Sequence, residues 1–308
     1  MSTSPESFAV ATTVTPTSSH AYAAHFPAEW CIGAVPHGGY VTSVFQQVAS
    51  THFATALAAQ QQPHTISLHL EFLRRTVVGP ADFEVRDAKA GRQTSNVQIT
   101  LRQGGREVVT GFLIQSNMRL DFGLSLPTDY ALHPAPIAAD ISKLRRDADP
   151  EWARMPDVPF SKFRKATQRV HFFTPRHGQR HASITDQWLS FVNGERFTNE
   201  SIGFVADMFL QPVENYRPSK GSSDSETSGW VRHWYPTLVL NLEPKKLLPD
   251  EGVEFLFVRA RSKQIQKGRM DLEVTVLDET GDIVALSNHL ALIMSASRNT
   301  QGRLDSIL

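Results

Sequence analysis

Residues 65–71 read Thr-Ile-Ser-Leu-His-Leu-Glu, and residues 237–243 read Thr-Leu-Val-Leu-Asn-Leu-Glu. The two stretches share Thr, two Leu and Glu in the same register, and each opens a series of alternating apolar and polar residues. A helix-like segment precedes each of them. Repetition on this scale indicates an internal duplication, so we expect one helix-plus-sheet unit to occur twice in the chain.

The first unit is predicted to contain one amphipathic helix and a meander of strands. Apolar residues recur at helical spacing within 41–58, which predicts a helix there. An extended stretch is expected at 8–14, before this helix. Alternation of apolar and polar side chains predicts the strands, and Gly104-Gly105 is a hairpin signal. The expected strands are 65–72, 81–88, 93–103 and 107–116.

The second unit is predicted to repeat this plan. A helix is expected at about 198–210, with Asp207 in its middle among apolar neighbours. The serine-rich segment 220–229 has the composition of a flexible loop. Proline and charged residues fill the segment between the units, which gives a hotdog unit at 1–120, a linker at 121–168 and a second hotdog unit at 169–308. The expected strands are 170–173, 182–189, 236–243, 254–263, 269–278 and 282–295.

One helix followed by a meander of long strands does not fit a doubly wound α/β fold, in which helices and strands alternate one to one. A sheet curled around a single helix, used twice, fits the pattern better. The sequence therefore predicts an α+β protein with the double hotdog fold, two tandem helix-wrapped antiparallel sheets in one chain.

Composition excludes several classes of protein. Lys plus Arg equals Asp plus Glu at 31 each, so no net charge attracts nucleic acid or an anionic membrane. Cys31 is the one cysteine, which excludes an intrachain disulfide, and its apolar neighbours predict an inert buried thiol. No apolar run approaches the roughly 18 residues of a membrane span.

Localisation is expected to be cytoplasmic. Residues 1–6 lack the basic-then-apolar order of a signal peptide. The tail 305–308 reads Asp-Ser-Ile-Leu and only partly resembles the Ser-Lys-Leu peroxisomal signal, so a peroxisomal location is the less favoured alternative.

Five segments together carry a resemblance to a known family. They are Trp30 to Tyr40 with its Pro-His-Gly-Gly-Tyr core, the strand 67–75, Ala206-Asp207, Pro236-Thr237-Leu238 and the closing strand 284–294. In this order and spacing they resemble the acyl-CoA thioesterase II family, and within it the fungal thioesterase-like branch, over about residues 20–297. The resemblance implies a thioester hydrolase for an acyl-CoA or a carrier-bound acyl or polyketide chain.

The resemblance also implies a site in the second hotdog, where an Asp, a Thr and a Gln position and activate the attacking water. Asp207 and Thr237 match the first two positions, and His289 occupies the position of the Gln. Unlike Gln, a neutral His can accept the proton of the water. Apolar neighbours are expected to raise the Asp207 pKa and make it a better base.

Structural roles are the alternatives for these three residues. Asp207 could lie on the outer face of its helix, and His289 could be an ordinary strand residue. Thr237 could serve strand packing alone, because Thr65 holds the same place in the first copy.

Substrate binding is expected of His37, Gly38, Gly39 and Tyr40 at the start of the first helix. The glycines would let the backbone approach a ligand, and helix-start N–H groups favour an oxyanion or a phosphate. A plain tight turn is the alternative. No metal site is predicted, because His177 and His181 have no third ligand nearby in the sequence. No cofactor motif and no Gly-x-Ser-x-Gly elbow occur.

The expected partners are an acyl thioester and, for a carrier-bound substrate, an acyl carrier protein; we also expect a homo-oligomer. Two other functions stay open. Asp207 and His289 could transfer protons as in hotdog hydratases and dehydratases, or loss of the Gln could mark a ligand-binding protein of secondary metabolism.

Overall fold

The computed structural model describes residues 6–121, 123–217 and 232–300. The flexible loop expected at 220–229 and the tail 305–308 therefore lie outside the described residues.

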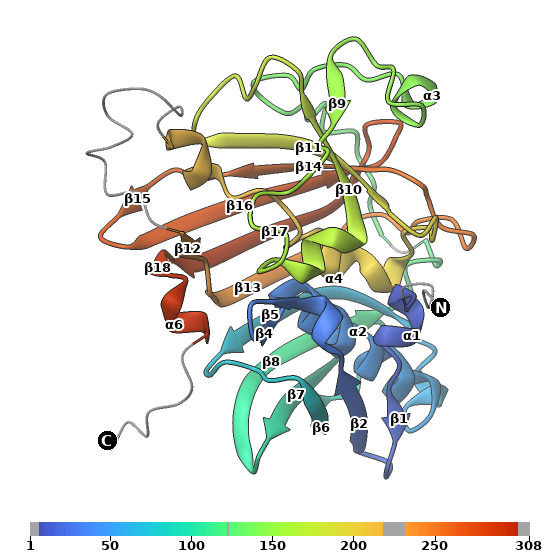
Figure 1. Cartoon of the computed structure of the whole chain (residues 1–308). Coiled ribbons are helices and arrows are strands. Elements are labelled where there is room, and N and C mark those ends of the chain that lie inside the picture. Colours follow the sequence, from blue (N-terminus) through green and yellow to red (C-terminus); the bar gives the residue numbers. More distant parts are fainter. Residues whose placement is uncertain (1–5, 122, 218–231, 301–308) are drawn as a thin grey trace.

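One antiparallel sheet of 14 strands runs through both halves of the described chain (Figure 1). This is an α+β protein with the double hotdog fold. The sheet order in the first half is β1 (Thr15–Pro16), β2 (Ala21–Phe26), β6 (Gly79–Lys89), β7 (Ser95–Gln103), β8 (Arg106–Ser116) and β5 (His64–Phe72). It continues with β13 (Thr237–Pro244), β17 (Ile283–Leu292), β16 (Arg269–Leu277), β14 (Leu256–Arg261), β11 (Ile184–Phe191), β10 (Val170–Pro175) and β9 (Trp152–Arg154), and β15 (Ile265–Gln266) pairs with β16.

The two repeated stretches are the strands that join the halves. β5 pairs antiparallel with β13, and His69 lies opposite Asn241, which is its equivalent in the repeat. Nδ1 of His69 and Oδ1 of Asn241 are 2.7 Å apart. Antiparallel pairing of two copies of one strand places equivalent residues face to face, so a local two-fold axis passes between these residues. The two expected sheets are thus joined edge to edge.

The long helix of the first half is α2 (Gly38–Ala54), which packs against β5, β7 and β8. It begins earlier than predicted, because Nδ1 of His37 accepts the backbone N–H of Tyr40 and makes His37 the N-cap. It also ends earlier, and the short 3-10 helix η2 (Ala58–Gln60) follows. The stretch expected to be extended at 8–14 contains instead the helical turn α1 (Phe8–Ala11), capped by Ser7.

The second-half helix is much shorter than predicted. Thr198 caps the 3-10 turn η4 (Asn199–Ser201), and α4 (Ile202–Val205) follows. The helix does not continue to 210, because the side chain of Gln187 accepts the N–H of Leu210 and donates to the carbonyl of Met208. Asp207 therefore follows the helix rather than lying in its middle, which corrects the expectation.

The two helices lie side by side between the halves (Figure 1). Oγ of Ser43 accepts the N–H of Phe204 at 2.9 Å, and Oε1 of Gln46 accepts the N–H of Gly203 at 3.0 Å. A Cβ on Gly203 would lie 2.5 Å from that oxygen. Helix α2 therefore supplies acceptors to the first turn of α4, and both helices share one hydrophobic core.

Short elements complete the fold. The segment 121–168, expected as a linker, contributes α3 (Ile141–Leu144), β9 and part of η3 (Lys165–Arg169). The others are η1 (Ala28–Trp30), β3 (Cys31–Ile32) paired with β4 (Val35–Pro36), η5 (Pro212–Tyr216), β12 (His233–Trp234) paired with β18 (Met294–Ser295), and α6 (Ser297–Thr300).

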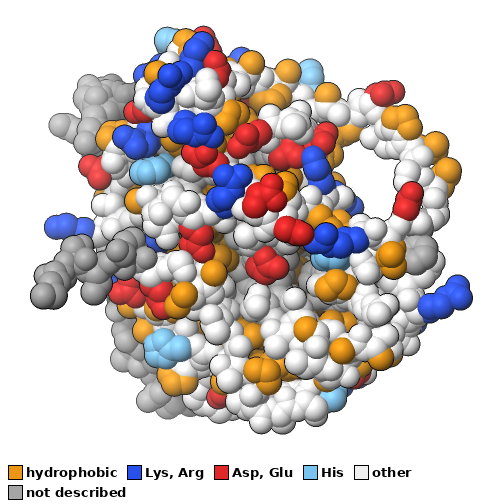
Figure 2. All heavy atoms as spheres, turned by 90° about the vertical axis from the view of Figure 1, so that its right-hand side faces the viewer, with side chains coloured by type: hydrophobic (Ala, Val, Ile, Leu, Met, Phe, Trp, Pro, Cys, Tyr) orange, Lys and Arg blue, Asp and Glu red, His pale blue; other side chains and the backbone are white. Residues whose placement is uncertain are grey.

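The distribution of surface charge and the burial of the cysteine agree with the expectations from composition. On the face shown in Figure 2, basic and acidic side chains are interspersed and form no extended patch of one sign. Cys31 is buried as predicted, and burial raises the pKa of its thiol to about 12, which disfavours the reactive thiolate. Within the described ranges no helix has the length and apolarity to cross a bilayer.

Candidate active site

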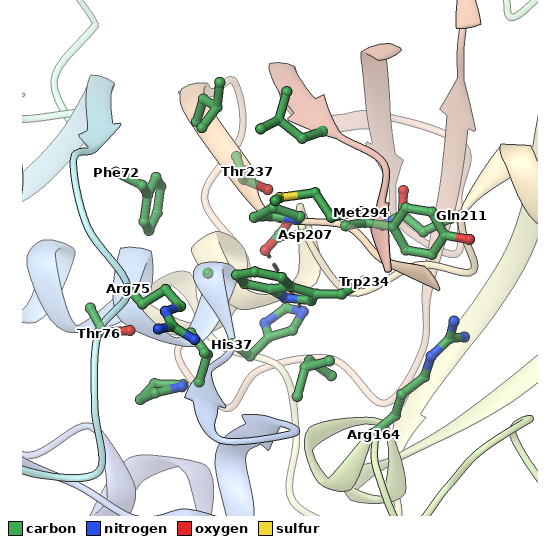
Figure 3. Close-up of a pocket in the computed structure, with 18 of the residues that line it drawn as sticks. His37, Phe72, Arg75, Thr76, Arg164, Asp207, Gln211, Trp234, Thr237 and Met294 are labelled. Atoms are coloured by element: carbon green, nitrogen blue, oxygen red, sulfur yellow. Dashed lines mark ion pairs between the residues drawn. The ribbon is translucent and has the colours of Figure 1, made fainter. Parts of the chain in front are cut away.

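A cavity of about 900 Å³ lies where the two halves meet (Figure 3). His37, Gly38 and Phe72 line it from the first half, and Asp207 and Thr237 line it from the second. Much of the remaining lining is apolar and comes from Met208, Phe209, Leu210, Trp234, Tyr235, Leu238, Leu292 and Met294.

Asp207 is held by three groups from two elements, α2 with its N-cap and β17. Its Oδ2 accepts the backbone N–H of Gly39 at 2.7 Å and lies 3.7 Å from Nε2 of His37. Its Oδ1 lies 3.4 Å from Nδ1 of His289. Figure 3 shows the side chains of Asp207 and His37 directed towards each other. The carboxylate is only 7% exposed, so its position is set by the protein.

The environment of Asp207 lowers its pKa. Burial by itself would raise the Asp207 pKa, but His37, His289 and the Gly39 N–H together outweigh burial and lower it below its usual value. This corrects the expectation that apolar neighbours would raise it. Asp207 is therefore an anion at neutral pH, suited to holding and polarising a water molecule.

Hydrogen bonds orient the His289 ring. The single proton of Ser287 Oγ goes to the carbonyl of Asn241 at 2.5 Å. Nε2 of His289, 2.8 Å from the same oxygen, must then be the donor to it. Nδ1 faces Oδ1 of Asp207 at 3.4 Å and forms no hydrogen bond within the described residues. The His289 side chain is fully buried and lies behind Asp207, outside the described cavity lining.

His37 is a neutral imidazole with an assignable tautomer. Its Nδ1 accepts the N–H of Tyr40, so the ring proton is on Nε2, which faces Asp207. Burial lowers the His37 pKa more than the charge of Asp207 raises it. His37 is therefore an uncharged side chain at the cavity wall that orients the carboxylate.

The two glycines allow α2 to approach Asp207. A Cβ on Gly38 would lie 2.8 Å from Oδ2 of Asp207, and one on Gly39 would lie 2.7 Å from its Cβ. Close approach was expected, but it is to Asp207 rather than to a ligand. The N–H of Gly38 has no acceptor among the described residues, and Gly38 lines the cavity. This N–H is available to a bound carbonyl oxygen.

Tyr40 does not belong to the cavity, which corrects its expected contact with substrate. It is fully buried, its hydroxyl donates to the carbonyl of Ala11 at 2.6 Å, and its ring stacks on Trp30. The expectation failed because the tyrosine follows the two glycines around the helix and points into the core.

Thr237 opens β13 directly after Pro236 and lines the cavity. Its cross-strand neighbour is the small residue Ala291, and no hydrogen bond of its hydroxyl is formed with another described residue. The hydroxyl is therefore available to a water molecule or a substrate near Asp207.

A basic cluster at the cavity was missed by the sequence reasoning. Asp207 is the one acidic residue in the described lining, and five arginines line it: Arg74, Arg75, Arg106, Arg164 and Arg298. Arg164 pairs with Glu214 at 3.1 Å, whereas Arg74 donates to the backbone carbonyl of Glu107. The adjacent arginines 74 and 75 at the end of a repeated strand were the one local signal.

The arrangement has the parts of a hydrolytic site. An anionic carboxylate and a free helix-start N–H line one cavity, a buried imidazole lies behind the carboxylate, and a cationic rim adjoins the apolar wall of the cavity. A double hotdog with such a site defines the class of thioesterase-like proteins.

Models of known families match both halves. Residues 26–116 match the acyl-CoA thioesterase N-terminal domain, and residues 127–293 match the acyl-CoA thioesterase C-terminal domain. The chain is 36% identical to the thioesterase-like protein TwmA of Talaromyces wortmannii over 95% of this chain and 93% of that protein. The chain therefore belongs to the acyl-CoA thioesterase family, and this membership supports a hydrolase.

Solved structures share the fold. A hot dog protein of Alicyclobacillus acidocaldarius superposes with a TM-score of 0.70 at 16% identity, covering 94% of this chain and 98% of that one. An acyl-CoA thioesterase II of Mycobacterium marinum superposes with a TM-score of 0.62 at 14% identity, covering 95% and 100%. At these identities the comparisons establish the double hotdog fold alone.

Proposed function

We propose that this chain hydrolyses acyl thioesters, and that Asp207 holds the attacking water at the cavity between the two halves. One observation carries the proposal: the ionised Asp207 lies between the cavity and Nδ1 of His289, 3.4 Å away. In the proposed mechanism His289 is neutral with its proton on Nε2, so that Nδ1 is a proton acceptor behind the carboxylate.

The reaction follows from these groups. The water donates to Asp207 while the Thr237 hydroxyl holds it, and its oxygen attacks the thioester carbon. The proton of the water passes to Asp207 and on to Nδ1 of His289, while Nε2–H stays bonded to Ser287. The Gly38 N–H stabilises the oxyanion. Collapse of the intermediate breaks the C–S bond, and the thiolate leaving group takes the proton back.

The substrate is proposed to be an acyl-CoA. Its phosphates suit the arginines of the cavity, because guanidinium groups bind phosphate oxygens, and its acyl chain suits the apolar wall. A carrier-bound acyl or polyketide chain presents one phosphate on its pantetheine arm and is the alternative. Pairing of chains into a homo-oligomer remains part of the proposal.

A hydratase or dehydratase is the second candidate, because Asp207 and His289 lie together. The position of His289 speaks against it, since its side chain is fully buried and absent from the described lining of the cavity. Direct proton transfer to a substrate carbon would need the imidazole to reach the cavity.

Parallel assays on a saturated acyl-CoA and the 2-enoyl-CoA of the same length separate these functions. We expect the saturated substrate to release free thiol, with a KM that rises with salt because the arginine contacts are screened. Loss of the enoyl absorbance without thiol would indicate hydration, and binding of both substrates without turnover would indicate a binding protein. Either of these results would refute the proposed hydrolase.

A further inference from the structure

A second group of chemically active side chains lies in the first half, away from the cavity. His20 precedes β2, His52 lies in the last turn of α2, and Asp87 lies near the end of β6. One donor atom from each lies within 4.8 Å of the other two. None of the three lines the cavity, so the proposed hydrolysis leaves this cluster without a role.

Both imidazoles contact the Asp87 carboxylate through Nε2. Nε2 of His52 lies 2.8 Å from Oδ1 of Asp87, and Nε2 of His20 lies 3.2 Å from Oδ2. Two ligands of a tetrahedral zinc ion, each at about 2.0–2.1 Å from the metal, lie about 3.3 Å apart. The two imidazole–carboxylate distances are therefore close to this ligand spacing, and the three ligand atoms lie within 4.8 Å of one another.

The buried residue of the cluster, His52, is oriented in the way that is typical of a metal-ligating histidine. The His52 side chain is fully buried, and its other ring nitrogen, Nδ1, lies 2.8 Å from the hydroxyl of Tyr22. Such an outer hydrogen bond sets the ring orientation and directs the free nitrogen at the metal. A β-bulge lies in β6 between Asp87 and Lys89, and bulges of this kind re-aim side chains.

Access and charge also fit a cation. The side chains of His20 and Asp87 are 47% and 31% exposed, which gives an ion a route from solvent and leaves a fourth position for water. The Asp87 carboxylate offers two oxygens, one within 2.8 Å and the other within 3.2 Å of an imidazole nitrogen.

We propose that His20, His52 and Asp87 form a binding site for a divalent transition metal, with zinc as the best match to two imidazoles and one carboxylate. The ion would link the C-terminal end of α2 to β6 and to the entry of β2, because the three ligands come from these elements. A backbone hydrogen bond already joins the entry of β2 to β6, since the carbonyl of His20 accepts the N–H of Val85.

Calorimetric titration of the tag-free, chelator-treated full chain with zinc chloride tests the proposal. We expect one ion per chain and, at about a hundredfold excess over Kd, a rise in melting temperature of about 5 °C. His20→Ala and Asp87→Asn change partly exposed residues and should each weaken binding at least tenfold. Tyr22→Phe removes the outer hydrogen bond and should weaken binding by about 10–100-fold.

The matched control is His25→Ala, which removes an exposed histidine of the same strand β2 and should leave binding unchanged. Absence of saturable binding would overturn the proposal, as would equal affinity in His20→Ala, Asp87→Asn and the unchanged chain. Magnesium binding as tight as zinc binding would also overturn it, because imidazole ligands disfavour magnesium.

Discussion

The strands β5 and β13 have the same sequence pattern and the same irregularity but differ in what surrounds their first threonine. A β-bulge falls between Thr65 and Ser67 in one and between Thr237 and Val239 in the other. Thr65 accepts a hydrogen bond from Nε2 of Gln115 at 2.8 Å. Thr237 faces Ala291 and lines the cavity. The threonine of the first copy is thus engaged in a hydrogen bond inside the protein, whereas the threonine of the second copy lines the cavity.

The same contrast recurs one strand away. Leu68 and Leu240 are equivalent in the repeat, and they lie opposite Leu113 and His289. The helices diverge as well, since α2 has 17 residues and α4 has four. The two halves therefore share one backbone plan but differ in helix length and in the side chains around their first threonine and the neighbouring strand.

The largest expected effect comes from removing the charge of Asp207. Asp207→Asn keeps an acceptor for the Gly39 N–H but cannot take a proton, so turnover of acyl-CoA should fall by about 10²–10⁴. Thiol release measures this, with the circular dichroism spectrum as the control for folding. A folded variant with near-normal turnover would remove Asp207 from the proposed mechanism.

The second largest effect on turnover is expected from substitutions of His289, whose equivalent in the first half is Leu113. His289→Leu installs the residue type of Leu113, and His289→Gln keeps a polar group that cannot accept a proton. Both should lower turnover by about 10² if the imidazole takes the proton. If His289→Gln retains full activity while His289→Leu loses it, the imidazole only orients Asp207.

Substitutions of the two equivalent threonines should have smaller effects, on turnover for Thr237 and on stability for Thr65. Thr237→Val should lower turnover by about tenfold, the worth of one hydrogen bond, with little change in stability. Thr65→Val leaves the buried Gln115 amide without its acceptor and should reduce the free energy of unfolding by about 1–3 kcal/mol, with turnover retained. Kinetic and chemical-denaturation measurements on both variants check this. Equal kinetic losses would place catalysis in both halves.

The smallest effect concerns acid stability. Because burial lowers the His37 pKa below its usual 6.5, the unfolded chain binds a proton there that the folded chain excludes. Stability from this group is therefore full above about pH 6.5 and falls as pH drops towards the lowered folded value. His37→Gln should show a shallower decrease in melting temperature from pH 7 to pH 5. Parallel curves would mean that His37 titrates alike in both states.

Much of the fold could be predicted from the sequence, because periodicity along the chain records which residues face a core. The repeat, the strand positions and the double hotdog followed from patterns within short windows. Helix lengths were less predictable, since Gln187 ends the second helix through hydrogen bonds to Met208 and Leu210. No local pattern encodes that contact.

The sequence by itself determined that the chain holds two copies of one unit, that Thr65 and Thr237 hold the same place in them, and that Asp207 occurs in the second copy. Only the tertiary structure decided the electrostatics of the site, because the N–H that holds Asp207 comes from Gly39, 168 positions away. Tertiary structure likewise gathered the arginines at the cavity and brought His20, His52 and Asp87 together. Electrostatic interactions and metal ligation depend on the distances between atoms. Residues that are far apart in the sequence come within such distances only when the sheet has folded around its helices.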